Sequence, residues 1–170
     1  MRAILSWVIV SAVAGFVMLG TLAWADEKKA EKISEDKLPK KVMNTIKDRF
    51  PEAKIASAEK ETEDGKVVYD IELTHKGRKY EMDIQEDGTL IEIEKQVDIK
   101  DLPKAVTKAL ETKYPNAKLE EIMEVNKVKG KKETPDHYEV VLVTADKKKL
   151  EVTVSLDGKT IKAEKAEPNK

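Results

Sequence analysis

Carboxylate side chains recur at every second position in three consecutive segments of this chain. They are Asp70 and Glu72, then Glu81 and Asp83, then Glu92 and Glu94. In extended strands this spacing directs all six to one face, and cross-strand neighbours lie only about 5 Å apart. Like charges so close destabilise a sheet unless a cation offsets them. The pattern predicts a binding surface for a basic partner, or for a divalent cation, where oxygen ligands favour calcium or magnesium. The alternative is a solvated face screened by nearby lysines.

The second half of the chain carries a milder version of this pattern. Val141 and Val143 take the alternating positions there and predict an apolar patch on the same face. Between two expected strands, residues 126–136 form a predicted loop that contains Lys129, Lys131 and Lys132. Such a basic tip can steer an acidic partner by long-range attraction. It can equally be a solvated turn.

The composition argues against several other classes of function. The chain has no cysteine and only two histidines, so neither disulfides nor a conventional transition-metal site is expected. A formal net charge of −1 does not fit a nucleic-acid-binding protein, which needs a basic excess. No G-x-S-x-G, H-E-x-x-H or P-loop pattern is present. We therefore interpret the chain as non-enzymatic, with no catalytic residues and no cofactor.

The sequence of the elements that position these side chains is repeated once along the chain. Residues 37–54 (KLPKKVMNTIKDRFPEAK) and 101–118 (DLPKAVTKALETKYPNAK) share seven of eighteen positions at an offset of 64. Each copy has an early proline, an apolar stripe at i, i+4 and i+8, and a second proline that stops the helix. Asp36 and Asp101 are the expected caps. Each copy predicts a short helix that lies across an apolar surface.

That surface follows each helix as alternating apolar and polar residues. Period-2 alternation with one apolar face indicates antiparallel strands covered on one side. Asp87-Gly88 and Asp157-Gly158 predict tight hairpin turns of type I′. The predicted fold class is α+β: two tandem α-β-β-β-β units, each with its helix packed on one face of an antiparallel sheet. The sequence leaves open whether the eight strands form one continuous sheet.

The N-terminus predicts export. Arg2, an apolar run and Ala23-Trp24-Ala25 form a signal peptide over residues 1–25, with cleavage expected after Ala25; an uncleaved anchor is the alternative. Residues 26–35 follow as a flexible charged leader. The two repeats are predicted at 36–96 and 97–165, and residues 166–170 as a disordered tail. The expected location is periplasmic or secreted, without membrane attachment after cleavage and with an undetermined oligomeric state.

The repeated helix followed by four strands resembles the PepSY-like, beta-lactamase-inhibitor-like domains of exported bacterial proteins. The matching residues are Leu38, Pro39, Val42, Ile46, Phe50, Pro51, Ala53 and Lys54, and then Leu102, Pro103, Val106, Leu110, Tyr114, Pro115, Ala117 and Lys118. The resemblance implies an accessory protein that binds, or inhibits, another exported or envelope protein. It transfers no inhibitory loop residue by residue, and this chain lacks the disulfides of the best-known inhibitor of related architecture.

Overall fold

The computed structural model describes residues 30–63 and 65–163. The elements in chain order are β1 (Glu31–Lys32), η1 (Glu35–Lys37), α1 (Lys40–Arg49), β2 (Lys54–Glu63), β3 (Lys66–His75), β4 (Arg78–Gln85), β5 (Leu90–Gln96), η2 (Ile99–Asp101), α2 (Lys104–Lys113), β6 (Lys118–Lys129), β7 (Lys132–Val143), β8 (Lys149–Ser155) and β9 (Ile161–Ala163). The predicted signal peptide, the start of the leader and the predicted tail lie outside the described residues.

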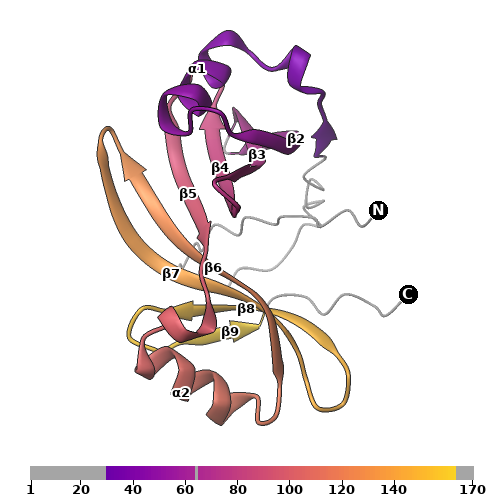
Figure 1. The fold of residues 1–170 in the computed structure, drawn as a ribbon, viewed down its shortest axis with the longest axis vertical. Helices are drawn as coiled ribbons and strands as arrows, with labels where there is room; N and C mark the ends of the chain where they lie inside the picture. The colour runs from indigo at the N-terminus through magenta and orange to yellow at the C-terminus, as the bar shows by residue number, and fades with distance from the viewer. Residues whose placement is uncertain (1–29, 64, 164–170) are drawn as a thin grey trace, which may run out of the picture.

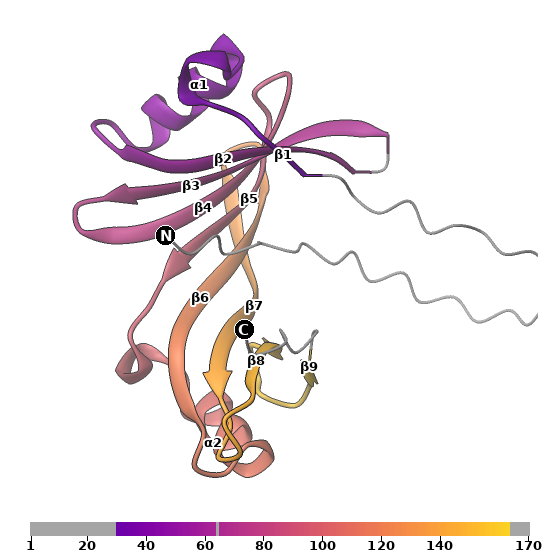
Figure 2. The same ribbon diagram turned by 90° about the vertical axis from the view of Figure 1, so that its right-hand side faces the viewer.

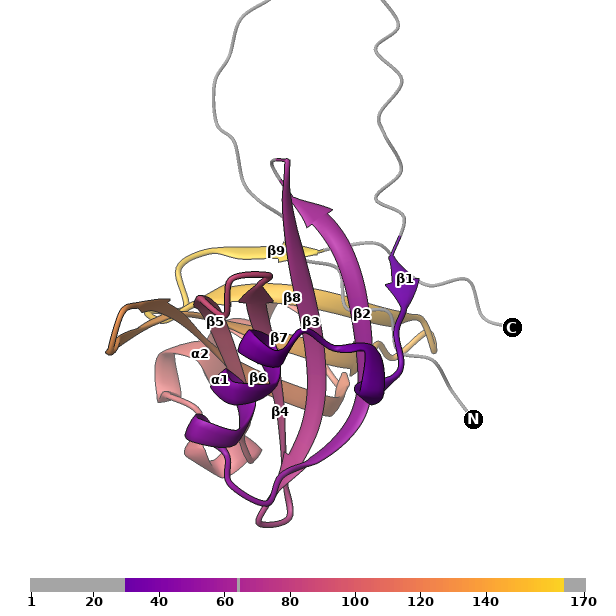
Figure 3. The ribbon, with the colours of Figure 1, turned by 90° about the horizontal axis from the view of Figure 1, so that it is seen from above.

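The strands form one antiparallel nine-stranded sheet in which each strand pairs with its sequence neighbours, from β1 to β9. The α+β prediction is confirmed, and the sheet is continuous with one more strand than expected. It twists and bends so strongly that α1 and α2 lie at opposite ends of the molecule (Figure 1, Figure 2). Seen from above, α1 lies over the strands of the first half (Figure 3).

Each helix covers its own hydrophobic core. Val42 and Ile46 of α1 are buried with Phe50 against Ile71, Leu73 and other apolar residues of the first-half strands. Val106 and Leu110 of α2 are buried against Val140, Val152 and their neighbours in the second half. The apolar stripes predicted from the sequence are therefore the faces that bury against the sheet, as the alternating strands require.

Strand β5 belongs to both halves of the molecule. It pairs with β4 on one side and with β6 on the other. The residues that follow β1 and β5 make equivalent hydrogen bonds. After β1, the Ile33 N–H donates to the Ala58 carbonyl of β2 (2.9 Å). After β5, the Val97 N–H donates to the Ile122 carbonyl of β6 (3.0 Å). These positions are related by the same offset of 64 as the helices. Each structural repeat thus begins with a strand before its helix, and β5 closes one repeat and opens the next.

This arrangement differs from the interpretation of residues 26–35 as a flexible leader. Glu31 and Lys32 pair with Lys60 and Glu59 of β2, and Ile33 packs against the first core. Two charged residues have no apolar alternation, so the pattern gave no sign of a strand. The boundary predicted between residues 96 and 97 falls at the end of a strand that both halves share.

Two local predictions were wrong. Asp36 and Asp101 lie in the short 3-10 helices, while Pro39 and Pro103 occupy the N-cap positions with no side-chain cap. The Asp-Gly turns are not type I′, because only Gly88 and Gly158 have positive φ there. Both glycines lie against the start of a helix: a Cβ on Gly158 would come 2.5 Å from the carbonyl oxygen of Ala105.

Candidate functional site

The sheet face that carries no helix, called the helix-free face below, lies on the inside of the bend (Figure 1, Figure 2). All six predicted carboxylates project from it, because the register pairs Asp70 with Asp83, Glu72 with Glu81, Glu81 with Glu94 and Asp83 with Glu92. The face is not open to solvent as predicted. Glu81, Asp83, Glu92 and Glu94 are buried, and Glu121 and Glu139 of the second half lie close to this region.

Lys79 of β4 neutralises part of this face. Its ammonium group lies 2.7 Å from Glu72, 2.8 Å from Glu81 and 3.1 Å from Glu121. Glu121 comes from β6, so this one cation joins carboxylates of both halves. Burial lowers the pKa of Lys79, but the surrounding carboxylates outweigh it and hold the pKa above its usual value. Burial also raises the pKa of Glu72, yet hydrogen bonds from Lys79 and Ser57 bring it below its usual value.

Glu94 of β5 has no such compensation. Its exposed fraction is 8%, and among the described residues no hydrogen bond or ion pair reaches its carboxylate. Burial raises its pKa well above the usual value, and the charges of Glu139, Glu81, Glu92 and Asp83 raise it further. A carboxylate this buried ordinarily has a cationic or hydrogen-bonding partner. Glu94 is therefore a buried carboxylate on the helix-free face without a cationic partner among the described residues.

Burial also disfavours the charged form of two further carboxylates on this face, Asp70 and Glu92. Burial, with the nearby charge of Glu81, raises the pKa of Asp70 to about 8. Glu92 has an exposed fraction of 4% and pairs with Lys127 across the β5–β6 ladder. Burial still raises the pKa of Glu92, although Lys127 partly offsets it.

The second half contributes Glu139 and His137 of β7 to the same region. His137 lies 2.8 Å from Asp136 and 3.2 Å from Glu139. Burial lowers its pKa, but these two carboxylates outweigh that and raise it above the usual value. Val141 and Val143 are also on the helix-free face and half-buried. Their cross-strand partners include Glu121, Glu151 and Lys149, so they do not form a continuous apolar patch.

Residues 126–136, predicted as a loop, are mostly strand. β6 continues to Lys129 and β7 starts at Lys132, so only Gly130 and Lys131 form the turn. This β6–β7 arm rises beside β5 toward α1 (Figure 1). Val128 of the arm packs against the first core and Glu133 pairs with Arg49 of α1, which explains why the segment is ordered. Lys127 is partnered with Glu92, while Lys129, Lys131 and Lys132 are exposed at the tip.

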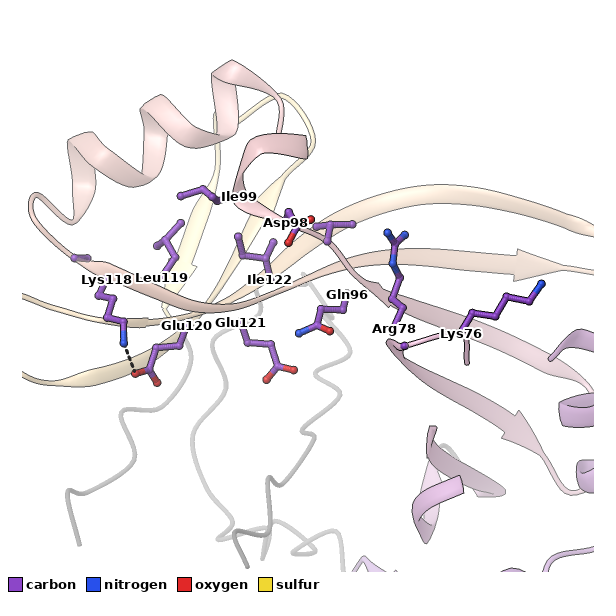
Figure 4. Close-up of a pocket in the computed structure, with 13 residues that line it drawn as sticks. Lys76, Arg78, Gln96, Asp98, Ile99, Lys118, Leu119, Glu120, Glu121 and Ile122 are labelled. Carbon is purple, nitrogen blue, oxygen red and sulfur yellow. Dashed lines mark ion pairs between the residues drawn. The ribbon is translucent and has the colours of Figure 1, made fainter. Parts of the chain in front are cut away.

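A cleft that the sequence analysis did not predict lies where the two halves of the sheet meet. This junction cleft has a volume of about 690 Å³, and its lining comes from the β3–β4 turn, the segment after β5 and the start of β6 (Figure 4). Its apolar lining includes Val97, Leu119 and Ile99, whose exposed fraction of 55% is high for an isoleucine. The repeat pattern could have indicated this cleft. The second repeat follows the first in the sheet, so the β3–β4 hairpin of the first repeat lies beside η2 of the second.

Within the described residues, no three Asp, Glu or His side chains lie close enough together to hold one metal ion as they stand. In the same part of the chain, no helix is long and apolar enough to cross a membrane.

Comparison with known proteins gives a family and a fold. The sequence model of the family described as "Putative beta-lactamase-inhibitor-like, PepSY-like" matches the chain twice, at residues 20–92 and 67–162. A comparison with curated proteins finds no match.

Solved structures from Bacteroides species share the fold. A BLIP-like protein of Bacteroides fragilis has 20% identity and a TM-score of 0.51, over 76% of this chain and 86% of that one. A DUF2874 family protein of Bacteroides uniformis has 15% identity and a TM-score of 0.56, over 74% and 88%. A protein of Bacteroides eggerthii described as periplasmic has 13% identity and a TM-score of 0.56, again over 74% and 88%.

Proposed function

Because this chain belongs to the PepSY-like, beta-lactamase-inhibitor-like family, we propose that it is a non-enzymatic binding module of the bacterial cell envelope. Its helix-free face takes a basic segment of another exported protein, as an inhibitor or accessory factor of that protein. The periplasmic description of a neighbour with the same fold supports this location, as does the predicted signal peptide.

The observation that carries the proposal is the uncompensated carboxylate of Glu94 on the inside of the bend. Glu81, Asp83, Glu92 and Glu139 surround it, and the cations of this region, Lys79 and Lys127, already have carboxylate partners. Because Glu94 is only 8% exposed, an arginine or lysine of a partner would have to enter the inside of the bend to reach it. There it would replace repulsion by attraction, in surroundings where water screens weakly. Electrostatic complementarity of this kind favours specific and fast association.

The test uses the mature chain and a fluorescent lysine- and arginine-rich decapeptide, alongside capture of proteins from a periplasmic extract. The Glu94→Gln variant removes the central charge, and Glu111→Gln on the exposed side of α2 is the matched control. We expect binding that weakens with salt and falls about tenfold in Glu94→Gln only. Equal binding of peptide and captured proteins by both variants would show that the helix-free face is not the contact surface.

A second candidate is a sensor or buffer of calcium or magnesium on the same face, and Glu94 favours it as well. A divalent ion bound there would offset several carboxylates at once, although the side chains would have to move toward one another to share it. Calorimetric titration of the mature chain with each ion tests this. Heat release and a higher melting temperature, both lost in Glu94→Gln, are expected, and the absence of both with the unmodified chain would eliminate this candidate.

A further inference from the structure

The junction cleft contains an unused strand edge. β5 pairs with β6 only from Gln96 opposite Met123 to Glu92 opposite Lys127, and one more hydrogen bond joins Val97 to Ile122. The chain then turns away into η2, while β6 extends back to Lys118. On the side of β5, residues 118–121 of β6 therefore have no strand partner in the described part of the chain. Backbone groups on such an edge can pair with an added strand.

The same stretch of β2 in the first repeat also extends past its short partner β1. The difference lies in what faces it. At the junction, the β3–β4 turn of the first repeat forms the opposite wall with Lys76, Gly77 and Arg78. β1 is the outermost strand of the sheet, so no described strand lies beyond it to supply such a wall. Of these two strand edges, the one at the junction therefore has a facing wall, and the one beside β1 has none among the described strands.

The junction cleft is lined by three cationic and three acidic side chains, and two of the cations lack an ion-pair partner among the described residues. Lys118 pairs with Glu120 (3.9 Å), Asp98 with Lys100 (3.6 Å) and Glu121 with Lys79 (3.1 Å). Lys76 and Arg78 are exposed, and no hydrogen bond or ion pair reaches either side chain from the described residues. Figure 4 shows Lys76 and Arg78 at one end of the cleft, with the Lys76 side chain extending outward, and Ile99, Leu119 and Ile122 toward the other end, where Lys118 also lies. The cleft thus combines a free strand edge, an apolar wall and two unpartnered cations.

We propose that the junction cleft binds an extended peptide segment of a partner protein, which adds as a strand to residues 118–121 of β6 and presents a carboxylate to Lys76 and Arg78. An apolar side chain of the segment packs on Ile99 and Leu119. Main-chain hydrogen bonds between the peptide and β6 supply affinity. The side chains that line the cleft supply specificity, because they favour a peptide with an apolar residue close to an acidic one. A cleft of this volume lies within the range of ordinary ligand sites. The site uses none of the carboxylates around Glu94, so it is independent of the proposed function.

The test selects binders of the mature chain from a random decapeptide library and measures the best one by fluorescence anisotropy. We expect selected sequences that alternate β-branched residues with an Asp or Glu. In Lys76→Asn/Arg78→Gln, where asparagine tolerates the positive φ of Lys76, affinity should fall about tenfold. Lys47→Gln on α1 is the control for loss of an exposed charge, and Glu94→Gln should bind normally.

Amide chemical shifts give a second readout. Those of Leu119 and Glu121 should move on binding in the unmodified chain, and proline at one central position of the peptide should abolish binding by removing a ladder hydrogen bond. The proposal is overturned if no acidic sequences are enriched, or if the double variant binds them as tightly as Lys47→Gln. Loss of binding in Glu94→Gln alone would assign the peptide to the helix-free face instead.

Discussion

Replacing Glu94 with glutamine should make this protein more stable at neutral pH, which is unusual for a buried polar residue. The amide keeps the size of the side chain and removes its charge. In the unmodified chain that charge is 8% exposed, and burial and then four neighbouring carboxylates raise its pKa. The folded state therefore carries an electrostatic cost that the unfolded state does not.

The size of the effect follows from Coulomb's law. Two charges about 5 Å apart interact with roughly 3 kcal/mol at an effective dielectric constant of about 20. Lys79 and Lys127 offset part of this repulsion, since each already pairs with a neighbouring carboxylate. We expect the free energy of unfolding of Glu94→Gln to rise by about 2 kcal/mol at pH 8.

The pH dependence has a definite sign. An acid whose pKa is raised on folding takes up a proton as the chain folds, so stability is lost as pH rises from its unfolded to its folded pKa. For Asp70 that range runs from about 4 to about 8, with up to about 1.4 kcal/mol per pH unit. The raised pKa of His137 acts in the same direction above its unfolded value. The protein should be more stable at pH 5.5 than at pH 8, and less steeply so in Glu94→Gln.

Urea denaturation followed by circular dichroism, at pH 5.5 and 8.0, measures both quantities. Glu111→Gln, an exposed carboxylate on α2, should change neither. If Glu94→Gln were less stable than the unmodified chain at pH 8, Glu94 would have a favourable partner and the reasoning would be refuted.

Two other predictions concern stability. Gly158→Ala should cost about 2 kcal/mol or more, because it combines positive φ with a Cβ 2.5 Å from the Ala105 carbonyl oxygen. Gly130→Ala, with positive φ and open space, should cost only the backbone part, and equal losses of melting temperature would contradict the close approach. Lys79→Met should cost about 2–3 kcal/mol at pH 8 by leaving three carboxylates without their shared cation, and less at pH 5.5. Urea titration against Lys47→Met, an exposed lysine of α1, checks this, and an equal cost at both pH values would argue against it.

The spacing of residues along the chain predicted the features that depend on local backbone geometry, namely the helix limits and the strand faces. Helix limits came within a residue or two, since Pro39 and Pro51 restrict where a helix can start and stop. The assignment of all six carboxylates to one face was correct, because the period of two is a property of any strand. Their burial could not be predicted in the same way, since it depends on the twist accumulated across the strands from β3 to β7.

The missed elements failed for specific reasons. β1 has two charged residues and no alternation, although Ile33 stands at the offset of 64 from Val97 and the repeat could have located it. The arm at 126–136 looked like a loop because Lys, Gly and Pro dominate it. Its order depends on contacts of Val128 and Glu133 with the first half, which no local pattern contains.

The shared strand β5 has a consequence for how the molecule comes apart. If one half unfolded alone, the other would lose either its last or its first strand, so neither half is a separate cooperative unit. The chain should therefore melt in a single transition despite its two hydrophobic cores. If the chain were cut after Gln96, the C-terminal fragment would lack β5. Its strand β6 would then have an exposed edge along its whole length, which could pair with the same edge of another molecule.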